Sequence, residues 1–224
     1  MLNDWLIQNS RGKILLLRHG RVEAPDDAKR FIGQSDLPLS EAGRRQAARW
    51  QSRLAAVPLG TVVASDLSRC RETARIIAAG DQRVETAAGL REIDLGQWDG
   101  LPINEVKRRW PDAYRQRGED LAGFRPPAGE SFLDLQRRVV PAFETVLDRF
   151  PAPLLIVTHA GVIRMLLCHI LGMPVENLFR IALDYAALAL IDRRADGYRV
   201  QALNLKAERR QARPDMEKRF AGHG

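Results

Sequence analysis

The chain has few cysteines, few aromatic residues and little lysine. Only 2 of its 224 residues are cysteine and no CxxC pair occurs, so a disulfide framework is excluded. Phe, Trp and Tyr make up 6% of the chain, which leaves few rings on which nucleic-acid bases could stack. The net charge of +7 arises from 30 Arg and 5 Lys, and the arginines alternate with acidic residues along most of the chain. We expect no nucleic-acid partner and one pocket for a small anion.

Long hydrophobic runs are also absent. The longest apolar stretches, 14–17 and 154–157, are far shorter than the roughly 20 residues that a membrane-spanning helix needs. The first residues show no basic segment followed by an apolar one, so we expect no signal peptide. With 45% hydrophobic residues, the chain can bury a core and is not intrinsically disordered. We expect a soluble, cytoplasmic, globular protein with no membrane partner.

Apolar segments of strand length alternate with segments of helical periodicity. Continuous apolar runs predict buried strands, and apolar residues three and four positions apart predict helices. The predicted strands cover 13–17, 61–64, 154–158, 187–191 and 198–203, and the predicted helices cover 40–56, 66–79, 132–150 and 162–171. This alternation predicts an α/β fold, a three-layer α/β/α sandwich with a mostly parallel central sheet.

The predicted sandwich spans residues 13–205 and has an extension at each end. Residues 1–12 form an N-terminal extension, in which Leu6 and its apolar neighbours either dock as one helical turn or stay loosely held. Residues 91–130 contain four prolines and several glycines, so we expect an irregular, lid-like segment outside the core. Residues 206–224 are polar and lack periodicity, which predicts a basic, mobile tail.

Two of the four histidines directly follow predicted strands. His19 follows the first predicted strand and its neighbouring arginine, and His159 follows the third. Parallel strands place their carboxyl ends at one edge of a sheet, where open α/β folds bind ligands. A glycine within two residues of each histidine permits a tight turn there. We therefore expect both histidines in one site, whereas His169 and His223 have no such placement.

Two arginines share this predicted edge of the sheet. Arg18 precedes His19, and Arg69 enters its helix directly after the predicted strand 61–64, off the apolar stripe of that helix. A guanidinium is costly to desolvate unless an anion lies near it, and it donates paired hydrogen bonds to phosphoryl oxygens. Two guanidiniums and two imidazoles at one edge therefore predict a site for a dianion, such as a phosphoryl group.

The candidates for a general acid lie in the segment LREIDLGQWDG. Glu92, Asp94 and Asp99 all occur there, and the segment has little secondary-structure signal. Their spacing does not rank them, and each of the three is equally a candidate for a surface carboxylate.

A series of short motifs resembles the histidine phosphatase superfamily, the phosphoglycerate-mutase-like proteins. The resemblance begins with Arg-His-Gly at 18–20 and continues in order through FIGQSDLPLSEAG, SDLSRCRETA, LREIDLGQWDG, PAGES and VTHAG. Ordered matches over nearly every predicted element are far more specific than a single Arg-His-Gly. The resemblance implies the fold predicted above, with no metal ion and no cofactor.

The resemblance also implies a role for each matching residue. His19 would be the nucleophile that becomes phosphorylated, while Arg18, Arg69 and a protonated His159 would bind the phosphoryl group. Glu92 would be the proton donor, so the resemblance selects one of the three acids that their spacing left unranked. The chemistry is coherent, because a neutral imidazole can attack phosphorus and neighbouring cations favour that neutral form.

The sequence departs from the family pattern after Arg-His-Gly. Many relatives continue with Glu-Thr and have an asparagine five residues beyond the glycine, where this chain has Arg21 and Pro25. This departure and the short middle segment favour a phosphatase over a phosphoglycerate mutase. Arg21 either contacts the substrate or faces water. The motifs are most similar in wording to the α-ribazole phosphatase branch.

The sequence thus predicts a phosphomonoesterase of the histidine acid phosphatase type, with α-ribazole 5′-phosphate as a candidate among small phosphorylated metabolites. The alternatives are a 2,3-bisphosphoglycerate-dependent phosphoglycerate mutase, a metallohydrolase, and a non-catalytic module that binds a phosphorylated ligand. The metallohydrolase is disfavoured because no HxxxH spacing occurs and Arg18 would repel a divalent cation. We expect a monomer or a homodimer.

Overall fold

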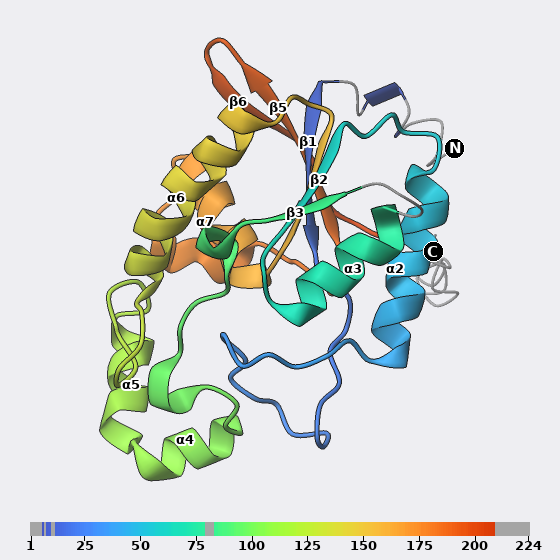
Figure 1. The fold of residues 1–224 in the computed structure, drawn as a ribbon. Helices are drawn as coiled ribbons and strands as arrows, with labels where there is room; N and C mark the ends of the chain where they lie inside the picture. The colour runs from blue at the N-terminus through green and yellow to red at the C-terminus, as the bar shows by residue number, and fades with distance from the viewer. Residues whose placement is uncertain (1–5, 7, 10–11, 79–82, 209–224) are drawn as a thin grey trace, which may run out of the picture.

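The computed structural model describes residues 6, 8–9, 12–78 and 83–208, and its centre is one six-stranded sheet (Figure 1). The strands lie in the order β3-β2-β4-β1-β5-β6. Their bounds are β1 Lys13–Arg18, β2 Thr61–Ala64, β3 Val84–Thr86, β4 Leu154–Thr158, β5 Leu188–Arg194 and β6 Gly197–Leu205. Strands β1 to β4 run parallel, and β5 pairs antiparallel with β1 and β6. The mostly parallel sheet is confirmed; β3 was not predicted because its three residues form no apolar run.

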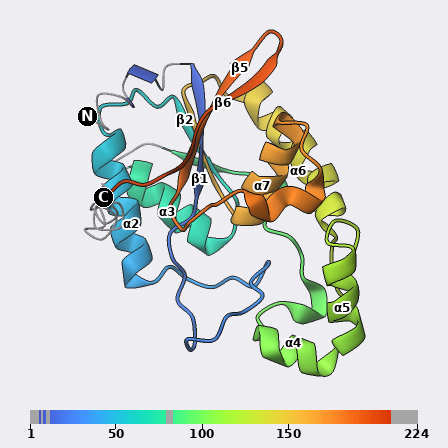
Figure 2. The ribbon, with the colours of Figure 1, turned by 180° about the vertical axis from the view of Figure 1, so that it is seen from behind.

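Helices cover both faces of the sheet (Figures 1 and 2). Their bounds are α2 Glu41–Leu54, α3 Ser68–Ala78, α6 Phe132–Arg149 and α7 Ala160–Ile170. Side chains of β1 alternate between the faces: Leu15 and Leu17 pack with α2 and α3, whereas Ile14 and Leu16 pack with α6 and α7. The predicted three-layer sandwich is confirmed. Within the described ranges, none of the helices is long and apolar enough to cross a membrane.

Serine side chains cap two of these helices. Ser40 Oγ accepts the amide of Gly43 at 3.2 Å in the first turn of α2. Ser131 and Asp134 form a reciprocal capping box at the start of α6. These caps satisfy amides that would otherwise lack a partner in the first turn of the helix. They explain why both helices begin close to where the sequence predicted.

The segment 91–130 is more ordered than predicted. It contains two further helices, α4 (Ile103–Arg109) and α5 (Pro111–Glu119). Trp98 is fully buried in the core, among the rings of Phe31, Trp110, Tyr114 and Phe124. The prediction of an irregular segment outside the core was therefore wrong. The prolines had suggested an irregular segment, but Pro102 and Pro111 stand at the N-terminal ends of α4 and α5, where proline is tolerated.

The two predicted extensions fall partly outside the described residues. Leu6 is fully buried against α2 and α3, so this residue docks on the body, whereas Leu2 and Trp5 lie outside the described residues. At the other end, Ala207 is buried and its carbonyl accepts Nε of Arg53 at 2.9 Å. The predicted mobile tail is therefore packed at its start, and residues 209–224 lie outside the described part.

Candidate functional site

The two predicted histidines meet at the carboxyl edge of the sheet. Strands β1 and β4 are neighbours, and the amide of His19, just past β1, donates to the carbonyl of Thr158 at 2.9 Å. The rings of His19 and His159 stand edge to face, with their centroids 5.2 Å apart. Both side chains are buried. The structure thus brings together the two imidazoles that the sequence placed at separate strand ends.

His19 presents one ring nitrogen to the site. Its Nδ1 lies 2.7 Å from the carbonyl oxygen of Gly20. A carbonyl only accepts, so Nδ1 carries the proton and Nε2 keeps a lone pair. Burial, and then the positive charges of Arg69 and Arg18, hold the pKa of His19 well below its usual value. The imidazole is therefore neutral at pH 7, which is the state that a nucleophile needs.

Arg69 is buried behind the histidines and is held by three acceptors. Its Nη1 and Nη2 donate to the carbonyls of Ser35 and Gly33 at 2.7 and 2.5 Å. Its Nε donates to Nδ1 of His159 at 3.3 Å. Asp99 accepts the amides of Gly33 and Ser35 at 2.8 and 2.7 Å, and so fixes the loop that holds the guanidinium. This positive charge is therefore preorganised at the site.

His159 is neutral, although the family resemblance implied a protonated ring. Its Nδ1 accepts from Arg69, and its Nε2 donates to Oγ of Ser65 at 2.9 Å, so only Nε2 carries a proton. Burial, and then the charges of His19, Arg69 and Arg18, lower the pKa of His159 well below its usual value. Arg69 places positive charge against the ring in this structure, whereas the expectation of a protonated His159 concerned a ring in contact with a phosphoryl group and stays a prediction. A bound dianion would act in the opposite direction.

Arg18 leaves β1 toward the same edge. Its Nη1 donates to the carbonyl of Leu183 at 2.8 Å, and its Cζ lies 3.8 Å from the centroid of the Tyr185 ring. Its Nε is buried and has no hydrogen-bond partner among the described residues. An unpartnered buried donor is costly, so this nitrogen indicates a ligand oxygen as its partner.

The structure distinguishes Glu92 from the other two candidate acids. Glu92 is buried, and its carboxylate oxygens accept the amides of Gly161 and Ile93, each at 3.0 Å. Since Gly161 lies in the first turn of α7, the carboxylate sits next to the histidine that precedes this helix. Asp94 and Asp99 are instead occupied with amides of the surrounding loops. Geometry thus favours the same acid that the family resemblance implied.

The residue after His19 has to be glycine. The amide of Gly20 donates to Oγ1 of Thr73 at 3.1 Å, and a β-carbon on Gly20 would lie 2.6 Å from the carbonyl oxygen of Gly43. Oγ1 of Thr73 in turn donates to the carbonyl of Arg69 at 2.7 Å. The turn after β1 is thereby locked to α2 and to the helix that carries Arg69.

Three residues of this region were missed by the sequence reasoning. Ser65 holds His159 and follows β2, so the strand-end rule that found the histidines could have found it. Arg164, in α7, donates to the carbonyl of Ile181 at 3.1 Å; burial lowers its pKa, which the charge of Glu92 partly offsets. Tyr185 precedes an antiparallel strand, so the same rule does not predict its place beside Arg18.

A hollow of about 900 Å³ opens beside the site. Both Tyr185 and the exposed Arg21 line it, together with much of the segment 22–30. The ring of Tyr185 lies 5.7 Å from that of His19, centroid to centroid, so Tyr185 stands between the hollow and the histidine pair, although neither histidine lines the hollow itself. No group of three or more His, Cys, Asp or Glu side chains in the described part of the chain is arranged to hold a metal ion.

Known proteins share this sequence pattern. A profile of the histidine phosphatase superfamily (branch 1) matches residues 14–206. The bifunctional protein Rv2228c of Mycobacterium tuberculosis is 35% identical over 191 residues, which cover 83% of this chain and 51% of that protein. The chain thus spans about half the length of that relative. The probable phosphoglycerate mutase GpmB of Yersinia pestis is 34% identical over 184 residues, covering 80% of this chain and 84% of that protein.

A solved structure shares the fold as well. The α-ribazole phosphatase from Shigella flexneri superposes with a TM-score of 0.79 at 26% identity, and the match covers 86% of this chain and 96% of that one. The sheet order and the pair of strand-end histidines therefore occur within a fold already known for this class of protein. Sequence and structure agree that the chain belongs to the histidine phosphatase superfamily.

Proposed function

We propose that the protein is a phosphomonoesterase that hydrolyses a small phosphorylated metabolite through a phosphohistidine at His19. One observation carries the proposal: a neutral imidazole with its Nε2 lone pair available lies beside Arg18, whose buried Nε has no partner among the described residues. A phosphoryl group at this place would accept from Arg18 and receive the lone pair of His19.

The reaction proceeds in two steps. In the first, Nε2 of His19 attacks phosphorus, the N–P bond forms, and the bond from phosphorus to the leaving oxygen breaks. Protonated Glu92 gives its proton to that oxygen. In the second, water attacks the phosphohistidine, the Glu92 carboxylate takes a proton from the water, and the N–P bond breaks. Inorganic phosphate leaves, and His19 and Glu92 return to their starting states.

Positive charge around the phosphoryl group lowers the barrier to both steps. Arg18 and the preorganised Arg69 stabilise the charge on the equatorial oxygens, which is the main contribution that a protein makes to phosphoryl transfer. The charge of a dianion beside His159 raises the pKa of that ring as the substrate binds. The added proton goes to Nδ1, which gives up its hydrogen bond from Nε of Arg69 and frees that nitrogen to donate to a phosphoryl oxygen. The ring then adds a third positive charge to the site.

We place the rest of the substrate in the hollow lined by Tyr185 and Arg21. Its volume suits a leaving group larger than a simple alcohol, and Arg21 lines it together with charged residues of both signs in the segment 22–30. α-Ribazole 5′-phosphate is our first candidate, supported by the similarity to the Shigella flexneri phosphatase. The Yersinia pestis relative supports a second candidate, transfer of a phosphoryl group between positions of a phosphoglycerate.

The test is phosphate release in the presence of EDTA. The panel contains 4-nitrophenyl phosphate, α-ribazole 5′-phosphate, 3-phosphoglycerate and fructose bisphosphates, and compares the wild type with His19→Ala. His169→Ala is a matched control, because this histidine is exposed at the end of α7. We expect release by the wild type and the control only, with an acid-labile phosphate on the wild-type protein. Release of phosphate by His19→Ala would contradict the assignment of His19 as the nucleophile.

A mutase assay separates the second candidate. The wild type is incubated with 3-phosphoglycerate and a catalytic amount of 2,3-bisphosphoglycerate, and both 2-phosphoglycerate and free phosphate are measured. Net phosphate release supports the phosphatase. Interconversion without release would replace it with the mutase while keeping the phosphohistidine.

A further inference from the structure

We propose that Arg138 and Glu130 form a clamp that positions Glu92 for proton transfer. The two residues touch neither of the histidines in the described structure, and they act on the acid through its backbone. This inference rests on the proposed role of Glu92 as the general acid.

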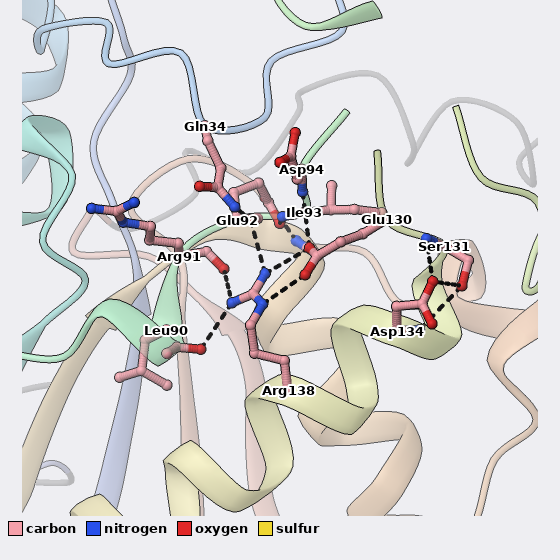
Figure 3. A network of polar contacts seen from close by, with 12 residues as sticks. Gln34, Leu90, Arg91, Glu92, Ile93, Asp94, Glu130, Ser131, Asp134 and Arg138 are labelled. Carbon is pink, nitrogen blue, oxygen red and sulfur yellow. Dashed lines mark hydrogen bonds and ion pairs between the residues drawn. The ribbon is translucent and has the colours of Figure 1, made fainter. Parts of the chain in front are cut away.

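Arg138 binds the backbone around Glu92 with its whole guanidinium (Figure 3). Nη1 donates to the carbonyls of Gly89 and Arg91 at 2.9 and 3.0 Å, and Nη2 donates to the carbonyl of Glu92 at 3.1 Å. Nε and Nη2 donate to the two carboxylate oxygens of Glu130, each at 2.8 Å. A guanidinium has five N–H donors in a rigid plane, and here each has an acceptor. This rigid group therefore binds three carbonyls of the turn that carries Glu92, one of which also accepts Nε2 of Gln34 at 3.1 Å.

Glu130 extends the clamp to the other side of Glu92. Its Oε2 accepts the amide of Asp94 at 3.0 Å, and its own amide donates to the carbonyl of Asp94 at 2.8 Å. Burial raises the pKa of Glu130, but the hydrogen bonds from Arg138 and from Asp94 outweigh burial and bring the pKa below its usual value. The carboxylate is thus ionised at neutral pH, and one ion pair ties down the residues before and after the acid.

The side chain of Glu92 is not part of the clamp. In the described structure its carboxylate accepts only the amides of Ile93 and Gly161. Loss of the clamp would therefore move the carboxylate without changing its immediate partners or its chemistry. A displacement of about 1 Å of a catalytic group can cost about 10²-fold in rate. The signature of the clamp is a loss confined to reactions that need the acid.

The test compares Arg138→Gln and Arg138→Lys with Arg137→Gln. Arg137 is the matched control, because it lies on the same helix, is exposed, and pairs only with Asp134. Each variant is assayed with an alkyl phosphate, whose leaving oxygen needs a proton, and with 4-nitrophenyl phosphate, whose leaving group does not. We expect both Arg138 variants to lose about 10²-fold in kcat/KM on the alkyl ester and little on the aryl ester. The ratio kcat/KM is the readout because it reports the first step alone, whereas kcat also contains the attack of water on the phosphohistidine, in which Glu92 acts on both esters. Lysine does not rescue, since a single ammonium nitrogen with three N–H donors cannot replace the three guanidinium nitrogens that bind five acceptors.

Two further variants keep the outcome decisive. Glu130→Gln preserves the shape of the side chain but removes the ion pair, and should show the same selective loss. It therefore tests the clamp even if the Arg138 variants fold poorly. In the double variant Arg138→Gln/Glu92→Gln the losses should not add. Equal losses on both esters in the Arg138 and Glu130 variants would overturn the clamp. If Glu92→Gln itself lowers the activity on both esters equally, Glu92 is not the general acid. That result would contradict the proposed mechanism, whatever the Arg138 and Glu130 variants show.

Discussion

A β-carbon on residue 161 would lie 2.2 Å from Oε1 of Glu92, so the acid occupies the space that any residue other than glycine at Gly161 would fill. The same glycine donates its amide to the other carboxylate oxygen at 3.0 Å. Gly161 lies two residues after His159, in the first turn of α7. One turn of helix thus places the Glu92 carboxylate beside His159, the two groups to which we assign proton donation and phosphoryl binding.

The first prediction concerns Gly161→Ala. The added methyl group would push the Glu92 carboxylate away while leaving His19 and Arg18 in place. We expect a loss of about 10²-fold in kcat/KM on alkyl phosphates and a much smaller loss in kcat/KM on 4-nitrophenyl phosphate, because kcat/KM reports only the first step. Steady-state kinetics on the two esters measure this difference. Equal kcat/KM values for the variant and the wild type on the alkyl ester would show that the carboxylate need not lie here.

Arg69→Lys should weaken binding of inorganic phosphate. Lysine keeps the charge but cannot bind Ser35, Gly33 and His159 together, so the preorganised geometry is lost. We expect the inhibition constant for phosphate to rise about tenfold or more, which corresponds to about 1.4 kcal/mol. Competitive inhibition assays measure it, with the exposed Arg45→Lys as a control. An unchanged constant for Arg69→Lys would remove this guanidinium from the pocket.

The stability of the protein should fall as the pH falls below about 6.5. The pKa values of His19 and His159 are both lowered in the folded state. Below pH ~6.5, the ordinary pKa of histidine, the unfolded chain therefore binds more protons than the folded protein. Stability then rises with pH in this window, by up to about 1.4 kcal/mol per pH unit for each histidine. Urea unfolding at pH 7.5, 6.5 and 5.5 measures the free energy. Vanadate and phosphate are left out of the buffer, because an anion that bonds to Nε2 of His19 would remove that ring from the titration. A flat profile contradicts the prediction.

Two glycines in helices should respond to alanine with opposite signs. A β-carbon on Gly43, in α2, would lie 2.1 Å from the carbonyl oxygen of Arg21, so Gly43→Ala should cost about 1–3 kcal/mol. A β-carbon on Gly118, in α5, would meet nothing within 4 Å, so Gly118→Ala should stabilise by about 0.5–1 kcal/mol. Thermal or urea unfolding of both variants measures the difference. A stabilising Gly43→Ala would show that the chain after His19 can move away from α2.

The sandwich and its histidine pair could be predicted because they depend on local patterns. Runs such as 13–17 and 154–158 are apolar throughout, since β1 and β4 are buried on both faces, and the residue after each run lies at the edge of the sheet by topology alone. The starts of α2 and α6 are local features as well, because the hydroxyl groups of Ser40 and Ser131 cap their first turns.

What could not be predicted depends on contacts between distant segments. Of the four rings around Trp98, one is Phe31 and the other three are spread over 110–124 without lying on one helix, so periodicity within 91–130 could not reveal that this segment joins the core. The protonation state of His159 depends on Arg69, 90 residues earlier, and on burial. Spacing alone left Glu92, Asp94 and Asp99 equal, because only the fold shows which of them reaches the amide of Gly161.

The direction of β5 has a consequence for how specificity evolves in this architecture. Strand β5 begins at the edge of the sheet where β1 and β4 end, and Tyr185 and Ala186 lie just before it. The amide of Ala186 donates to the carbonyl of His19 at 3.0 Å. That bond holds the main chain whatever side chain stands at 185. The side chain at 185, which lines the proposed leaving-group hollow, can therefore change without disturbing the main chain at this edge of the sheet. His19 and His159, which follow the parallel strands β1 and β4, would keep their places.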